Sequence, residues 1–166
     1  MTRPYPSNLV RQAQLRDGTA ITIRPIRPAD SDLEKQFVRH LSDDSRYYRF
    51  MQSLRELTPA MLEHFTHPDY DHEMALIAIV SYQGNETEIG VARYVKYSDG
   101  EHCEFAIAVA DPWQGKGVGR LLMQELFSAA RANGLKVMEG FVLTTNRAML
   151  RLQHTRRCRR CAALAA

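Results

Sequence analysis

The chain has 166 residues, of which 45% are hydrophobic and 25% charged, and its formal net charge is +3. This length suits one domain, and these proportions exclude disordered, collagen-like and low-complexity proteins. The apolar runs fall well short of the roughly 18 residues that a membrane-spanning helix needs, so no membrane partner is expected. The N-terminal residues carry no apolar signal segment, and we expect a cytoplasmic protein.

Charge is distributed unevenly along the chain. The last twenty residues contain six arginines and no acidic residue, so the preceding residues carry a net negative charge. Because a nucleic-acid-binding domain spreads its basic residues over a folded face, nucleic acid is not expected as a partner. The three cysteines, Cys103, Cys158 and Cys161, cannot all pair within the chain, which predicts free thiols in a reducing compartment.

The first predicted elements are a hairpin and three short helices. Residues 15–24 are expected to form strands around an Asp17-Gly18 turn. Capping signals and apolar residues at helical spacing predict the helices. They are expected over about residues 31–41, from about 42–45 onward, and from Thr58-Pro59 to about Phe65. In the second helix, Tyr47, Tyr48 and Arg49 are interpreted mainly as packing residues.

Strands dominate the second half of the chain. Three alternating segments predict an antiparallel meander, and a helix, a strand and a final helix follow. These elements are expected at residues 74–80, 89–96 and 103–110, then 116–132 and 135–143, with the final helix opening at Asn146. The order of elements, without repeats or linkers, predicts a single α+β domain.

The most informative segment runs from Phe105 to Arg120, where a predicted strand passes through a glycine-rich turn directly into a helix. Glycines allow a ligand to approach the backbone, and the unpaired N–H groups of a first helical turn favour an anion such as pyrophosphate. Gly115, Gly117 and Gly119 do not fit G-x-G-x-x-G, and no Gly-Lys-Ser/Thr completes a P-loop.

This turn instead matches Gln/Arg-x-x-Gly-x-Gly/Ala, the coenzyme A motif of the GNAT superfamily of N-acetyltransferases, as Gln114-Gly115-Lys116-Gly117-Val118-Gly119. The order of the surrounding elements also resembles that superfamily. Residues 15–19, 23–30 and 45–50 are similar to the GNAT domain of bacterial protein lysine acetyltransferases. The resemblance covers about residues 5–153 and implies a GNAT-type, mainly antiparallel sheet flanked by helices.

The resemblance also implies where acetyl-CoA binds. Backbone groups of Ile107, Ala108 and Val109 would line the pantetheine arm, and Gly115 to Arg120 would hold the pyrophosphate through N–H groups. Lys116 and Arg120 would add positive charge, and Asn146 would open a second coenzyme-contacting helix. The complete expected cofactor set is Ile107, Ala108, Val109, Gln114, Gly115, Lys116, Gly117, Val118, Gly119, Arg120 and Asn146.

Acetyl transfer to an amine needs a group that takes a proton from the ammonium form. Glu104, near the start of the strand that would carry the acetyl group, is the predicted catalytic residue, because the similar acetyltransferases place a glutamate there. Glu101 is the reserve candidate. Many GNAT enzymes place a tyrosine seven residues after the helix-opening Asn, where this chain has Gln153. Thiolate protonation would then fall to water, or the thiolate would leave as such.

The end of the chain departs from the family pattern. GNAT domains usually continue with two further strands, whereas residues 154–166 show no strand pattern, so we expect a GNAT domain over residues 1–153 and an atypical basic tail, the product of truncation or a frameshift. Cys158, Cys161 and His154 are too few for structural zinc, and no metal is expected.

The predicted function is acetyl-CoA-dependent N-acetyl transfer, with a protein lysine as acceptor. A small-molecule amine acetyltransferase and a catalytically silent acyl-CoA-binding module remain alternatives. A nucleic-acid-binding alternative depends on the basic tail alone.

Overall fold

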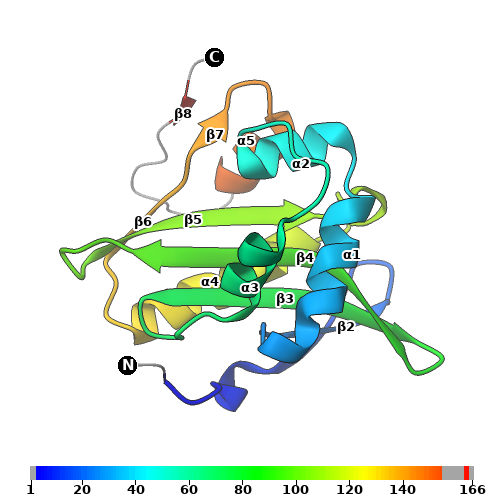
Figure 1. Cartoon of the computed structure of the whole chain (residues 1–166), viewed down its shortest axis with the longest axis horizontal. Helices are drawn as coiled ribbons and strands as arrows, with labels where there is room; N and C mark the ends of the chain where they lie inside the picture. Colours follow the sequence, from blue (N-terminus) through cyan, green and yellow to red (C-terminus); the bar gives the residue numbers. More distant parts are fainter. Residues whose placement is uncertain (1–2, 155–162, 165–166) are drawn as a thin grey trace.

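A six-stranded sheet in the order β1-β2-β3-β4-β5-β6 forms the centre of the computed structural model, which describes residues 3–154 and 163–164, with side chains as far as residue 151 (Figure 1). Every neighbouring pair is antiparallel except β5 and β6. The strands are β1 (Arg11–Gln14), β2 (Ala20–Pro25), β3 (Glu73–Tyr82), β4 (Asn85–Lys96), β5 (His102–Val109) and β6 (Val137–Glu139).

Helices cover both faces of this sheet (Figure 1). On one face α1 and α3 pack against the sheet, on the other α4 does, and α2 lies beside β5. The α-helices are α1 (Ser31–His40), α2 (Asp43–Phe50), α3 (Pro59–Thr66), α4 (Val118–Ala132) and α5 (Arg147–His154). Short 3-10 turns occur at η1 (Ser7–Leu9), η2 (Pro28–Asp30) and η3 (Asp111–Trp113). The predicted α+β class is confirmed.

Strand alternation explains why the core has two halves, since successive side chains point to opposite faces. Leu76 of β3 and Phe105 of β5 join Leu126 of α4 in one buried cluster. Ile77 of β3 and Ala108 of β5 belong to the other, beneath α1 and α3. Because β3 is buried on both faces, it reads as a continuous apolar run rather than an alternating one.

Several boundaries differ from the prediction by a few residues, and two of them have a clear local cause. The first hairpin strand ends at Gln14 rather than including Leu15, because the Leu15 N–H donates to Thr19 and the Gly18 N–H donates to Leu15, which closes the turn. The α4 helix begins at Val118 rather than residue 116, because Gly115 and Gly117 adopt φ of 75° and 103°, outside the helical region.

The C-terminal part of the sheet differs more. The strand predicted over residues 135–143 is two strands, β6 and β7 (Val142–Leu143), and β7 pairs in parallel with β8 (Ala163–Leu164). The expectation of no strand in the tail was therefore wrong for these two residues. Strand pairing is made by backbone N–H and C=O groups, so the two apolar residues Ala163 and Leu164 can pair with β7 although the sequence around them shows no alternating pattern. The remaining tail residues, including Cys158 and Cys161, lie outside the described residues.

The break between β6 and β7 occurs at Gly140, where β5 and β6 separate. Their pairing ends at Glu104 and Glu139. A Cβ atom on Gly140 would lie 2.5 and 2.6 Å from two ring carbons of Phe105, so the buried phenyl ring occupies the place of a side chain. The Phe105 ring packs against the Gly140 backbone, and β5 makes no further pairing with the described segment that follows β6.

We expect Gly140→Ala to destabilise the fold by about 1–3 kcal/mol, because the added methyl overlaps a buried ring. Urea unfolding measures the change. A Phe105→Leu substitution in the Gly140→Ala background should recover part of the loss by removing the overlapping atoms. If the two substitutions were simply additive, the ring would not be the source of the strain.

Candidate active site

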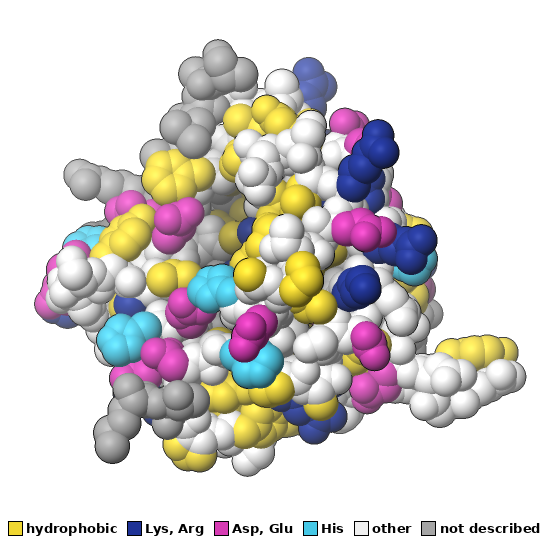
Figure 2. All heavy atoms as spheres, viewed as in Figure 1, with side chains coloured by type: hydrophobic (Ala, Val, Ile, Leu, Met, Phe, Trp, Pro, Cys, Tyr) yellow, Lys and Arg dark blue, Asp and Glu magenta, His cyan; other side chains and the backbone are white. Residues whose placement is uncertain are grey.

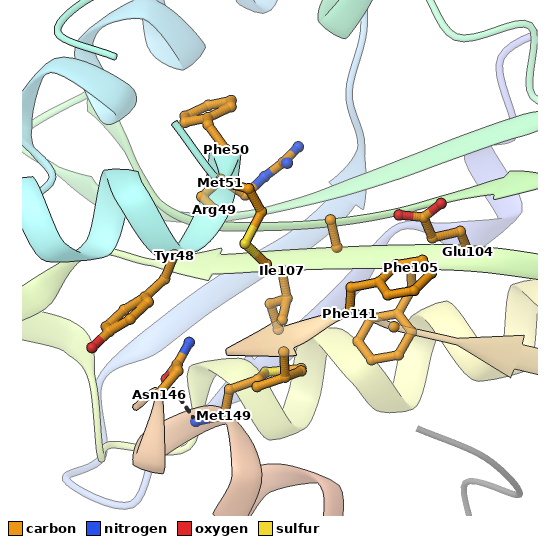
Figure 3. Close-up of a pocket in the computed structure, with 13 residues that line it drawn as sticks. Tyr48, Arg49, Phe50, Met51, Glu104, Phe105, Ile107, Phe141, Asn146 and Met149 are labelled. Atoms are coloured by element: carbon orange, nitrogen blue, oxygen red, sulfur yellow. Dashed lines mark hydrogen bonds between the residues drawn. The ribbon is translucent and has the colours of Figure 1, made fainter. Parts of the chain in front are cut away.

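A cavity of about 400 Å³ occupies the gap that opens beyond Gly140 (Figure 3). It lies between β5, the chain segment that follows β6, and the C-terminal half of α2. Glu104 lies toward one end, Tyr48 and Asn146 lie toward the other, and Arg49 lies between them on the α2 side. The lining residues are Tyr48, Arg49, Phe50 and Met51 from α2 and its C-cap, Glu104, Phe105, Ala106 and Ile107 from β5, and Gly140, Phe141, Val142, Asn146 and Met149.

The backbone of β5 presents polar groups to this gap. The backbone N–H and C=O groups of even-numbered residues point toward β4, because the His102 carbonyl accepts from the Tyr97 N–H and the Ala110 N–H donates to the Ile89 carbonyl. The backbone groups of odd-numbered residues point toward β6, since the Glu101 carbonyl accepts from the N–H groups of Lys136 and Val137. By this alternation the Phe105 carbonyl and the N–H and C=O groups of Ile107 point into the gap, whereas the Phe105 N–H belongs to the last β5–β6 bridge, at Glu104 and Glu139. An extended, amide-bearing ligand can pair with such an edge.

The glycine-rich turn lies past the end of β5, outside the cavity lining. Gly117 is the N-cap of α4 and offers no side chain, so the first-turn N–H groups of Val118, Gly119 and Arg120 have no side-chain cap. These groups and the helix dipole favour an anion. Val118 itself is buried against the sheet, which fixes the helix end, while Arg120 is exposed.

Two predicted cofactor side chains are engaged elsewhere. Lys116 Nζ lies 3.4 Å from an Asp17 carboxylate oxygen and 4.9 Å from the centre of the Trp113 ring. Gln114 Nε2 donates to the Val109 carbonyl at 3.0 Å and to Ser45 Oγ at 3.2 Å. These contacts fix the shape of the turn. Because both side chains are engaged, the backbone N–H groups of the turn are the groups best placed to bind an anion.

The remaining predicted residues separate into two groups. Glu104, Ile107 and Asn146 line the cavity, and Asn146 Oδ1 accepts from the Met149 N–H at 3.1 Å, which caps α5. Glu104 is exposed at the mouth of the cavity. Ala108 is buried under the α1–α3 side, so it does not reach the cavity. Glu101, the reserve candidate, bonds to Lys136 Nζ at 2.5 Å outside the cavity lining.

Comparison with known proteins identifies the family. A profile for the acetyltransferase (GNAT) domain matches residues 20–155. The chain belongs to the GNAT acetyltransferase family. An acetyltransferase of Pseudomonas aeruginosa is 38% identical over 135 residues, which are 81% of this chain and 73% of that protein. Acetyltransferase Pat of Mycolicibacterium smegmatis is 32% identical over 141 residues, and the match covers 84% of this chain but only 41% of that longer protein.

Solved structures agree with this assignment. The GNAT domain of S. lividans PAT superposes with a TM-score of 0.82 at 29% identity, over 90% of this chain and 87% of that one. The structure of yncA from Salmonella typhimurium with its cofactor acetyl-CoA superposes with a TM-score of 0.60 at 24% identity, over 81% of this chain and 77% of that one. The first likeness is to the domain suggested by residues 15–19, 23–30 and 45–50, and the second shows the fold.

In this GNAT acetyltransferase, one aspartate joins the glycine-rich turn to the wall of the cavity. The Asp111 carboxylate accepts from the Ser42 N–H at 2.9 Å, from Ser42 Oγ at 2.7 Å and from Ser45 Oγ at 2.8 Å. Although partial burial opposes ionisation, these bonds to Ser42 and Ser45 lower the pKa of Asp111 below its ordinary value of 3.8. The start of α2, whose far end lines the cavity, is thereby attached to the turn.

We expect Asp111→Asn to lower stability by about 1 kcal/mol, since an amide cannot accept from all three donors. A carboxylate with a lowered pKa stabilises the fold above its unfolded-state pKa and loses this contribution as pH falls through the folded-state value. The stability difference between wild type and variant should therefore be full above about pH 5 and shrink in more acidic buffer. Urea titrations at pH 3 and pH 7 measure it; an equal difference at both would contradict the assignment.

The cavity also contains residues that the sequence did not mark. Tyr48 and Arg49 were interpreted as packing residues, yet both line it, and Tyr48 Oη lies 3.5 Å from the Thr145 carbonyl. Their only signal was the resemblance of residues 45–50 to related domains. The side chain of Gln153 is not among those described. Within residues 3–154 and 163–164, no cluster of three His, Cys, Asp or Glu residues is suited to a metal ion, and no helix is long and apolar enough to cross a membrane.

Proposed function

We propose that the protein transfers the acetyl group of acetyl-CoA to a primary amine, with a lysine side chain of a protein as acceptor. The observation that carries this proposal is the gap between β5 and the segment after β6, which has an anion-binding helix end beyond one side and Glu104 at the other. Membership of the GNAT family supports the reaction type, and the resemblance to protein lysine acetyltransferases supports the acceptor.

The residues along the gap fit acetyl-CoA. The first-turn N–H groups of α4 suit a pyrophosphate, as in other helix N-termini that bind phosphate. The Phe105 carbonyl and the Ile107 backbone groups suit the amides of a pantetheine arm, because they continue a strand edge that β6 leaves unpaired. Asn146, whose side chain caps α5, fixes a second helix end beside the arm.

Acetyl-CoA, when bound, supplies a thioester carbonyl that accepts the amine and a thiolate that departs. Glu104 takes one proton from the ammonium form of the acceptor, directly or through water, so that the nitrogen lone pair can attack. The N–C bond forms and the C–S bond breaks, the nitrogen loses its second proton to solvent or to the sulfur, and CoA departs as thiolate or thiol. The Ile107 N–H, which points into the gap, would be the β5 donor able to stabilise negative charge on the carbonyl oxygen.

The surroundings of Glu104 suit a lysine presented by a large partner. Figure 2 shows the face that carries the cavity, with acidic and histidine side chains gathered below and to the left of its central hollow. The mouth has an exposed apolar rim, since Met51 and Phe141 are 39% and 41% exposed. An acidic approach attracts a cationic side chain, and an open rim admits one attached to a protein.

Two measurements test the proposal in sequence. Calorimetric titration with acetyl-CoA tests the site, and release of CoA in the presence of lysine peptides, folded proteins or small polyamines tests the acceptor. Turnover with peptides and proteins supports the lysine proposal. Turnover with small amines alone would favour a small-molecule acetyltransferase, and binding without turnover a silent acyl-CoA-binding module. A cytoplasmic location and the division into residues 1–153 and a basic tail stay predictions.

A further inference from the structure

Arg49 introduces a positive charge into the cavity that the proposed chemistry does not use. Its guanidinium carbon lies 4.9 Å from the centre of the Phe50 ring and 5.7 Å from that of Phe65. Within the described part of the chain it has these aromatic contacts but no hydrogen bond or close ion pair. The residue is half-buried and lines the same cavity as Glu104.

The position of Arg49 relative to Glu104 follows from the sheet. Arg93 of β4 is directly opposite Ala106, two residues along β5 from Glu104 and on the same face. The Arg93 guanidinium lies 4.4 Å from the centre of the Phe65 ring, which Arg49 shares. Arg49 therefore lies over the part of β5 that carries Glu104, near enough for the Glu104 carboxylate to favour the Arg49 charge. Figure 3 shows both side chains on the same side of β5.

The buried charges nearby leave Arg49 without a full counterion. Arg93 Nη2 is 3.8 Å from Glu34 Oε1, so the buried Glu34 carboxylate already faces one arginine. Burial, and repulsion from Glu34, raise the pKa of Glu88 well above its ordinary value, which favours the neutral form. Desolvation, together with the Arg93 charge, lowers the pKa of Arg49 to about 10, so Arg49 stays protonated at neutral pH. Arg49 and Arg93 thus both lie near the buried Glu34 carboxylate, and Glu104 at the cavity mouth is the other acidic group that favours the Arg49 charge.

We propose that Arg49 binds a carboxylate that the acceptor carries beside its reactive amine. A guanidinium pairs with a carboxylate through two parallel N–H bonds, which lysine or glutamine cannot reproduce. Glu104 receives the ammonium end and Arg49 the carboxylate end. The carboxylate comes either from an acidic residue next to the acceptor lysine or from a free amino acid. This inference rests on the proposed function, because it assigns the acceptor of that reaction.

Two matched pairs of acceptors test the inference by kcat/KM for CoA release. The first is a capped peptide with Lys-Glu against the same peptide with Lys-Gln. The second is Nα-acetyl-lysine against Nα-acetyl-lysinamide. Wild type should favour the carboxylate member of one pair about tenfold, the effect of a single charged hydrogen bond of about 1.4 kcal/mol. The peptide pair identifies a protein source and the amino-acid pair a small-molecule source.

Variants separate recognition from packing. Arg49→Gln should reduce the preference to about one, and Arg49→Lys should retain only part of it. Arg39→Gln is the control, since Arg39 is an exposed residue of α1 outside the cavity lining and its loss removes the same charge. A wild type without preference, or an Arg49→Gln variant that slows both members equally, would overturn the inference while leaving acetyl transfer intact. Absence of turnover with every acceptor would overturn both proposals.

Discussion

Replacing Gly117 by aspartate should weaken acetyl-CoA binding by about 100-fold or more, equivalent to roughly 2.7 kcal/mol. The new carboxylate would stand at the N-cap of α4, where it would take the first-turn N–H groups and repel a phosphate. Gly117 also has a φ of 103°, which disfavours any side chain. Calorimetric titration of wild type and variant measures the loss.

The control for this variant is Gly84→Asp. Gly84 has a φ of 80° and open space around its Cβ position, so aspartate brings the same charge and a similar backbone strain to the β3–β4 turn. Both variants should lose stability, but only Gly117→Asp should lose the ligand. Gly117→Ala separates strain from charge and should bind with intermediate affinity. Equal binding by Gly117→Asp and wild type would place the phosphates elsewhere.

Replacing Glu104 by glutamine should reduce kcat about 100-fold at neutral pH, the usual contribution of a general base. Glutamine keeps the size of the side chain but cannot take the proton. The variant rate should rise with pH, because solvent then supplies more of the neutral amine, whereas the wild-type rate should level off. Affinity for acetyl-CoA should be unchanged, since Glu104 is remote from the glycine-rich turn.

Glu101→Gln is the matched control for this variant. Glu101 is an exposed glutamate only three residues away, bonded to Lys136 and outside the cavity lining, and its variant should retain wild-type kcat and pH dependence. A large loss in Glu101→Gln combined with normal activity in Glu104→Gln would exchange the roles of the two residues. Normal activity in both would assign the proton transfer to solvent alone.

Much of the fold could be predicted because local signals and tertiary packing agree. The α2 and α3 helices carry their capping residues, since Ser42 Oγ accepts from the Ser45 N–H and Thr58 Oγ1 accepts from the Met61 N–H. The meander of β3, β4 and β5 follows apolar segments separated by glycine turns. In such segments the signals that set the conformation come from residues only a few positions apart in the chain.

What escaped prediction depends on contacts between distant residues. The break at Gly140 requires the Phe105 ring, 35 positions earlier in the chain, and a run of strand formers around it conceals the interruption. The sequence around Lys116 predicts a phosphate ligand, but in the folded chain its ammonium group lies beside the Asp17 carboxylate. Arg49 sits in a helix whose spacing suggests ordinary packing, and only the folded sheet brings it beside Glu104. Side-chain partners of this kind have no local pattern.

The phenyl ring that stands against Gly140 has a consequence for the speed of ligand entry. Because the ring and the glycine keep the strands apart, an incoming coenzyme breaks no strand-to-strand hydrogen bonds and waits for no rearrangement of the sheet. Because the gap is already ordered in the folded protein, little of the binding free energy is lost to ordering the backbone when the coenzyme associates. Capture should accordingly proceed in one kinetic phase, first order in coenzyme, without a plateau as its concentration rises.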